Sequence, residues 1–229
     1  MENKNKKTIL IIAGIAVIGT GSVFFALRAP AAPSGETTSM PLEDSGATKG
    51  TVLFKVTPHN AETEFNIFEV LRGADKIVVG KTNEVAGEIL LNMENPAKSE
   101  VGEFKVNART LKTDDTKRDG AISRFILKSS EAENEFITFT PTALSGMPNM
   151  LALGTPFNFV LNGDLKVSGV VKPVTFSGNA ILNSDGSVLT GSAETIVSRE
   201  AFSLVIPNIP FVANVGDAVT LKIKFSATQ

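Results

Sequence analysis

The chain has 229 residues and a formal net charge of −2, with 22 Lys and Arg against 24 Asp and Glu, and it contains no Tyr, Trp or Cys. Without a basic surplus or a Tyr or Trp for base stacking, we expect no nucleic-acid partner. The lack of Cys excludes disulfides, thiolate metal sites and a catalytic thiol. The 15 Phe carry nearly all the aromatic area, and Phe brings no polar group into a buried site.

The N-terminal region contains an apolar run at residues 8–27, 20 positions without a charge, after Lys4, Lys6 and Lys7 and before Arg28. A helix of this length extends about 30 Å, which is enough to cross a bilayer. The lysines favour a cytoplasmic N-terminus, so we expect the rest of the chain to be extracytoplasmic, in a periplasm or at the cell surface. Small residues at 29–31 leave open a cleaved signal peptide and a secreted product, although the run exceeds the usual length.

Three regions follow from this pattern. Residues 1–28 are expected to form a cytoplasmic head and a transmembrane anchor. Residues 29–50 contain Pro30, Pro33 and Pro41 with small and polar residues and lack a periodic apolar face, which predicts a flexible linker. Residues 51–229 are expected to form one folded domain.

Within that domain, alternating apolar and polar positions predict β-strands from residue 51 onward. The first strands are expected at 51–57 and around Phe65 and Ile67, with Asp75 and Lys76 in a loop. A single long strand is predicted over residues 79–91, where Val79, Val85, Gly87, Ile89 and Leu91 share one parity. Residues 104–108 predict the next strand.

One helix interrupts the strands. Thr113, Asp114 and Asp115 suit a helix N-terminus, and they predict a helix from about Thr116 to Ser130 that lies against an end of the domain. Asp114, Asp115 and Asp119 lack the ligand spacing of a calcium loop, so we expect capping and ion pairs with Lys117 and Arg118 rather than a metal site.

The second half of the domain has the clearest strand pattern. Residues 157–176 predict a long hairpin with a turn near 168–173, because Pro173 suits a turn or the first residue of a strand. Strands are then expected at 189–197, 202–206 and 219–225, with a loop at 207–216. About eight or more antiparallel strands and one helix predict an all-β barrel or a sandwich.

Signals for catalysis are few. His59 is the only histidine, and it stands in the turn-like sequence Pro58-His59-Asn60 without a nucleophile-elbow motif. A histidine hydrogen-bonded at a strand end is the favoured interpretation, and a hydrolase that uses His59 ranks last among the hypotheses. We expect no enzymatic activity and no cofactor.

Short segments along the whole domain follow one another in a characteristic order. They are TPHN at 57–60, VAGEI at 85–89, LKT at 111–113, KRD at 117–119, ITF at 137–139, GDLKVSGVVKPV at 163–174, SREAF at 198–202 and VGDAV at 215–219. In this order and spacing, residues 51–227 resemble the YceI-like family, which comprises lipocalin-like domains associated with polyisoprenoid binding.

The resemblance implies an extended antiparallel lipocalin-like β-barrel whose interior holds a long apolar chain. Such a chain would be a polyisoprenoid, an isoprenoid quinone or a fatty-acid derivative. By parity and analogy, the expected lining residues are Phe54, Phe104, Phe159, Leu161, Phe176, Leu221 and Phe225, and the expected polar contacts are His59 and Arg118. The chain departs from the family pattern at Ala121, where relatives often carry a histidine, and at Asn60, where serine is usual.

Two functions therefore compete. The leading hypothesis is a membrane-tethered, extracytoplasmic protein that binds a long-chain lipid or isoprenoid inside its barrel. The alternative is a structural or protein-interaction domain of the cell envelope whose barrel is filled by its own side chains. Periodicity does not distinguish them, because both need apolar residues that face inward. The sequence also leaves open whether the barrel forms a homodimer.

Overall fold

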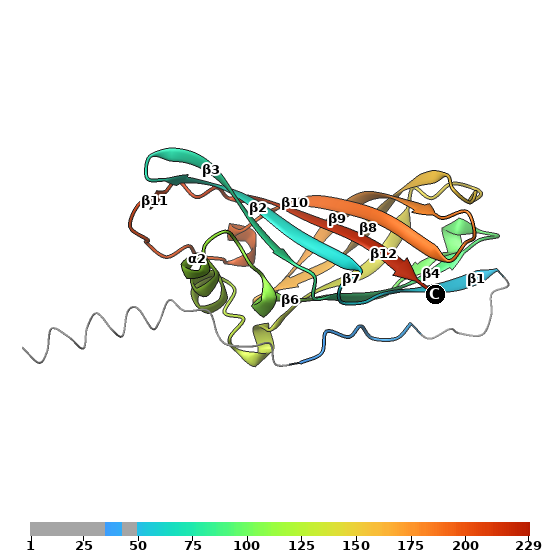
Figure 1. Cartoon of the computed structure of the whole chain (residues 1–229), viewed down its shortest axis with the longest axis horizontal. Coiled ribbons are helices and arrows are strands. Elements are labelled where there is room, and N and C mark those ends of the chain that lie inside the picture. Colours follow the sequence, from blue (N-terminus) through green and yellow to red (C-terminus); the bar gives the residue numbers. More distant parts are fainter. Residues whose placement is uncertain (1–34, 43–49) are drawn as a thin grey trace, which may run out of the picture.

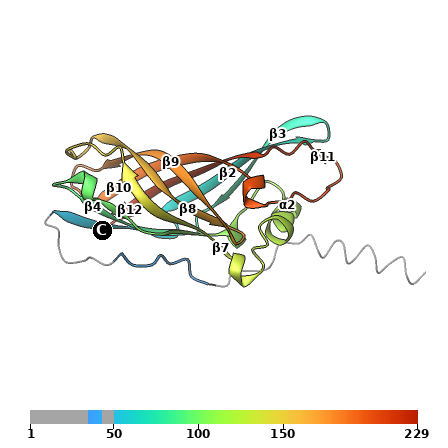
Figure 2. The same ribbon diagram turned by 180° about the vertical axis from the view of Figure 1, so that it is seen from behind.

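The computed structural model describes residues 35–42 and 50–229, which form an elongated β-barrel with a helix at one end (Figures 1 and 2). No helix within these ranges has the length and apolar character needed to span a bilayer. The transmembrane helix predicted at residues 8–27 lies outside the described residues.

The barrel is a closed ring of eight antiparallel strands in the order β1-β4-β6-β7-β8-β9-β10-β12. The ring closes where Lys55 of the first strand pairs with Thr228 of the last. Closure confirms the predicted all-β barrel and excludes the sandwich. The bounds are β1 Thr51–Val56, β4 Val85–Asn92, β6 Phe104–Asn107, β7 Phe136–Ser145, β8 Pro156–Val167, β9 Val170–Leu182, β10 Val188–Ser198 and β12 Ala218–Thr228.

A hairpin extends the barrel at the end where the helix lies (Figure 1). It consists of β2 (Ala61–Leu71) and β3 (Ala74–Thr82); β2 pairs with β12, and its far end pairs with β11 (Val212–Ala213). The short β5 (Glu100–Val101) pairs with β4. The single long strand expected at residues 79–91 is wrong, because β3 ends at Thr82 and β4 starts at Val85. Alternation continues through this break, so parity does not detect it.

The helix α2 spans Thr116–Ala121 and continues as one π-helical turn over Ile122–Ile126. Its start is as predicted, because the Asp115 carboxylate accepts hydrogen bonds from the backbone N–H groups of Lys117 and Arg118 at 2.7 and 3.3 Å. It ends earlier than the predicted Ser130, since Lys128 has a φ of 51°, which a helix does not allow. Four single-turn 3₁₀ helices complete the described elements: Pro96–Lys98, Ala108–Thr110, Ala132–Asn134 and Glu200–Phe202.

The strand expected at residues 202–206 is wrong. After the 3₁₀ turn, Ser203 has a φ of 58°, and the chain forms an irregular segment. The Arg199 side chain donates hydrogen bonds to the carbonyl oxygens of Leu204 and Gly216 at 3.0 and 3.1 Å. This side chain therefore binds carbonyl groups that a strand would pair with a neighbour. We call residues 204–215 the mouth loop.

Residues 35–42, which we call the strap, lie along the outside of the barrel (Figures 1 and 2). The Thr37 side chain is 3% exposed, and its hydroxyl donates to Glu84 at 3.1 Å. The backbone N–H of Leu42 donates to the buried Glu88 carboxylate at 2.6 Å. This part of the expected linker is therefore packed against the domain.

Candidate ligand-binding site

The barrel encloses a cavity of about 990 Å³. Its lining is largely apolar and comes from the inward-facing positions of the strands, from α2 with its π-helical turn, and from the mouth loop. Phe125 and Phe211 line the cavity and are also 47% and 74% exposed, so the cavity opens at the end of the barrel that carries α2. We call this opening the mouth.

The opposite end of the cavity is lined by buried side chains. Leu91 and Leu189 lie there, each 2% exposed, and Met147 and Leu151 from the connection between β7 and β8 pack against the same core cluster. The cavity thus runs from an apolar interior to an open mouth.

Seven of the nine predicted site residues line this cavity. They are Phe104, Phe159, Leu161, Phe176, Leu221, Phe225 and Arg118. Phe54 and His59 are not part of the lining. Phe54 is 0% exposed and packed in a cluster with Val56 and Val85, which leaves its ring no surface toward the cavity. His59 is exposed in the turn before β2, with a φ of 81°, and its backbone N–H donates to the Asn83 carbonyl oxygen.

Five of the lining phenylalanines lie against glycines of neighbouring strands. An added Cβ at each glycine would lie only 2.1 to 2.8 Å from a ring atom. The pairs are Phe65 with Gly80, Phe104 with Gly87, Phe139 with Gly163, Phe159 with Gly178 and Phe225 with Gly191. Since a missing Cβ lets each ring approach the backbone of the wall, the glycines leave room inside a barrel rich in Phe. Sequence reasoning missed Phe65 and Phe139, although both have the parity of inward-facing positions.

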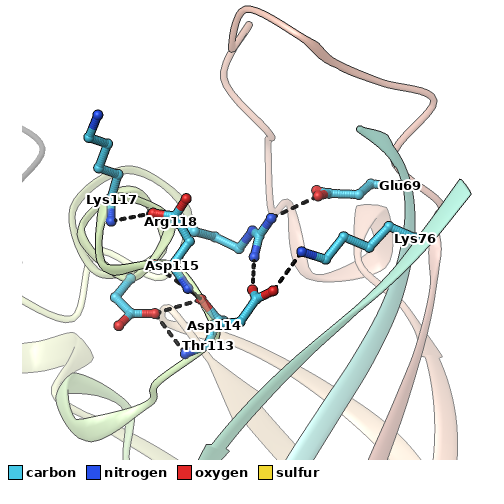
Figure 3. A network of polar contacts seen from close by, with 8 residues as sticks. Glu69, Lys76, Thr113, Asp114, Asp115, Lys117 and Arg118 are labelled. Carbon is cyan, nitrogen blue, oxygen red and sulfur yellow. Dashed lines mark hydrogen bonds and ion pairs between the residues drawn. The ribbon is translucent and has the colours of Figure 1, made fainter. Parts of the chain in front are cut away.

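A network of charged side chains joins α2 to the β2–β3 hairpin at the mouth (Figure 3). Arg118 forms ion pairs with Glu69 of β2, at 2.9 Å, and with Asp114. Asp114 also accepts from Lys76 of β3 at 2.6 Å. The hydrogen bonds from Lys76 and Arg118 and the charges of both side chains hold the pKa of Asp114 below its ordinary value. The predicted capping by Asp115 and the predicted ion pair between Asp114 and Arg118 are confirmed. Asp119 instead accepts hydrogen bonds from the backbone N–H and the hydroxyl of Thr113 at 2.7 and 2.8 Å.

Glu69 is a polar residue of the cavity that sequence reasoning missed. It shares the inward parity of Phe65 and Ile67, is 6% exposed and lines the cavity. The hydroxyl of Thr63 is buried in the same lining, and among the described residues it has no hydrogen-bond partner. The sequence signal that could have identified these two polar groups is a carboxylate and a hydroxyl at inward-facing positions of an otherwise apolar strand face.

An antiparallel barrel that encloses an apolar cavity with a few polar groups defines a class of proteins that hold a hydrophobic molecule inside a β-barrel. The model of the YceI-like domain family matches residues 54–227. The chain therefore belongs to the YceI-like domain family.

Solved structures with the same fold agree with this assignment. The crystal structure of Burkholderia cenocepacia BcnA is 14% identical with a TM-score of 0.57, and the match covers 76% of this chain and 99% of that one. A polyisoprenoid binding domain from Saccharophagus degradans, implicated in plant cell wall breakdown, is 11% identical with a TM-score of 0.57 and coverages of 77% and 97%. The Campylobacter jejuni YceI protein is 16% identical, with a TM-score of 0.52 and coverages of 66% and 84%. A search of curated proteins found no match.

Proposed function

We propose that this protein is a membrane-tethered, extracytoplasmic binding protein that holds a long apolar chain inside its barrel. The ligand class is a polyisoprenoid, an isoprenoid quinone or a fatty-acid derivative. The observation that carries the proposal is the cavity of about 990 Å³, whose apolar wall ends in the Glu69–Arg118 pair at the mouth.

The cavity has the size and chemistry for such a ligand. Pockets for small molecules have volumes of about 300 to 1,000 Å³, so this one lies at the upper end of the range. Each buried CH₂ contributes about 0.8 kcal/mol, and ten buried carbons therefore contribute about 8 kcal/mol before ordering costs. Affinity of this kind needs little polar recognition, which fits a wall with few polar groups.

Two further observations support the finer parts of the proposal. The apolar run at residues 8–27 and its preceding lysines support a tether with the domain outside the cytoplasm. The similarity in fold to the Saccharophagus degradans polyisoprenoid binding domain supports an isoprenoid among the ligand classes.

The competing functions find less support. A barrel filled by its own side chains would not leave a cavity of this volume. A hydrolase built on His59 would need that side chain near a bound substrate, whereas His59 lies exposed in a turn outside the cavity lining. The mass spectra described below also test whether the barrel forms a homodimer, which the sequence leaves open.

Native mass spectrometry of the full chain, purified in mild detergent, tests the binding function. We expect a bound long-chain mass, which organic extraction would identify, and loss of that mass in Leu221→Trp, whose new ring would occupy the cavity. Thr220→Trp is the matched control, because Thr220 is the neighbouring position of β12 and does not line the cavity. An empty protein that also takes up no added polyprenol, quinone or fatty acid would contradict the proposal.

A further inference from the structure

The surface around the mouth differs from the rest of the barrel. Seven of the ten large apolar side chains that are exposed in the described residues lie on the elements of this half. They are Phe68 and Ile77 of the β2–β3 hairpin, Phe125 after α2, Val171 next to the β8–β9 turn, Ile196 near the end of β10, and Val205 and Phe211 of the mouth loop. Apolar exposure concentrated in this way marks an interaction surface.

The mouth loop is the centre of this surface. Its 12 residues, LVIPNIPFVANV, contain no charged side chain, and Val205 and Phe211 are 73% and 74% exposed. Phe211 has a φ of 71°, a conformation that a bulky residue rarely adopts. Its carbonyl oxygen accepts a hydrogen bond from the Arg72 backbone N–H at 2.8 Å, which holds the loop against the hairpin. The protein thus maintains an exposed aromatic ring at the rim of an apolar cavity.

The position of the strap is a second, independent indication of the partner of this surface. Gly35, at its start, packs beside Glu135 and Phe136, whereas Leu42, at its end, contacts Glu88 and Gly102. The strap therefore runs from the side of the barrel near α2 toward the side near β1 (Figures 1 and 2). Only residues 28–34 separate Gly35 from the apolar run at 8–27. Seven extended residues span at most about 25 Å, so an anchor in that run would hold the mouth half near the bilayer.

From these two observations we infer that the mouth of the barrel docks onto the phospholipid bilayer, with Val205 and Phe211 of the mouth loop inserted among the lipids. The inference rests on the proposed function for its tether and its ligand. It adds that the ligand passes directly between the bilayer and the cavity, without crossing water. Because the mouth loop carries no charge, insertion depends on apolar contact and not on anionic lipid.

Site-directed fluorescence tests this orientation cleanly, because the chain contains no Cys. The full chain with Phe211→Cys carries an environment-sensitive fluorophore and is reconstituted into vesicles of phosphatidylcholine and phosphatidylglycerol. The matched control is Ser184→Cys, exposed in the β9–β10 turn at the opposite end. We expect blue-shifted emission and quenching by nitroxide-labelled lipids at position 211, and neither at 184.

Two results would overturn the inference. One is a protein that floats with the vesicles while the label at 211 stays unquenched. The other is an emission at 211 that is equally blue-shifted with and without lipid, because the apolar surroundings of the label would then not be the bilayer. If the full chain does not float with the vesicles, the membrane tether of the proposed function is contradicted as well. If the mass spectra show no bound ligand but the label at 211 is quenched by the lipids, the proposed ligand binding is contradicted and the docking of the mouth onto the bilayer is supported.

A charge in the mouth loop gives a second test. Val205→Asp places a carboxylate at an exposed position that does not line the cavity, and Ser184→Asp does the same at the opposite end. We expect Val205→Asp alone to reduce quenching at 211 and to slow the transfer of bound ligand to acceptor vesicles. Equal transfer rates in both variants would contradict direct exchange through the mouth.

Discussion

Arg118 and Glu69 lie 2.9 Å apart at the mouth of the cavity, with side chains only 16% and 7% exposed. The pair connects α2 to β2. We predict that Glu69→Gln lowers the free energy of unfolding by about 1 to 3 kcal/mol, because a largely buried guanidinium loses a charged partner. Urea unfolding measures the change. Lys76→Gln, which breaks the more exposed pair with Asp114, should cost less than about 1 kcal/mol. Equal losses in both variants would contradict this view of the pair.

The Asp114 bridges should weaken in acid. Since the pKa of Asp114 is lowered in the folded protein, its stabilisation is fully present above the unfolded pKa, about 4, and is lost as pH falls through the folded pKa. We therefore expect Asp114→Asn to be slightly less stable than the parent protein at pH 7, and we expect this difference to shrink as the pH falls below about 4. Thermal unfolding across this range measures the difference. A difference that does not shrink as the pH falls below about 4 would show that the carboxylate charge is not the cause.

The close approach of Phe104 to Gly87 predicts a cavity variant. An added Cβ at Gly87 would lie 2.8 Å from three atoms of the Phe104 ring, which are its three nearest heavy atoms. Gly87→Ala should push the ring into the cavity and weaken ligand binding, while the fold is retained. Phe104→Leu in the same chain should restore binding, because the smaller side chain makes room for the methyl group. Ligand titration measures both, and weak binding in the double variant would refute this role for the glycine.

The contact between Thr37 and Glu84 predicts the stability of the strap. Thr37→Ala removes a hydroxyl that donates at 3.1 Å from a side chain that is 3% exposed, whereas the adjacent Thr38 is exposed. We expect Thr37→Ala to increase amide hydrogen exchange in residues 35–42 by about fivefold, which corresponds to about 1 kcal/mol for a lost hydrogen bond. Thr38→Ala should leave the exchange unchanged. Equal exchange in the two variants would mean that the hydroxyl does not hold the strap.

Much of the barrel could be predicted from the sequence, because period-two alternation reports directly which side chains face inward. The hairpin of β8 and β9 is the clearest case, with its turn at Ser168 and Gly169, both at positive φ. The turn is tighter than expected, and Pro173 lies inside β9. Since β9 pairs with β10 only from Ser177 to Leu182, Pro173 stands where that edge of the strand has no partner. Proline is tolerated at such an edge.

The ligand-binding site could be predicted from the sequence less well than the barrel, and the reason is physical. Parity places Phe104, Phe159 and Phe225 inside the barrel, but it does not say whether their rings fill the interior or lie along its wall. That depends on glycines in other strands, such as Gly178 opposite Phe159 and Gly191 opposite Phe225. Likewise, the pairing of Arg118 with Glu69 joins residues 49 positions apart and becomes visible only in three dimensions.

The closure of the ring has a consequence for the timing of folding. Lys55 pairs with Thr228, so the contact that completes the barrel joins the first strand to the last. Contacts this distant in sequence make folding slow, because a long loop must close before they form. β12 also contributes Leu221 and Phe225 to the cavity wall. A chain whose β12 has not yet joined the ring therefore has no complete chamber, and under the proposed function the ligand can enter only after β12 is in place.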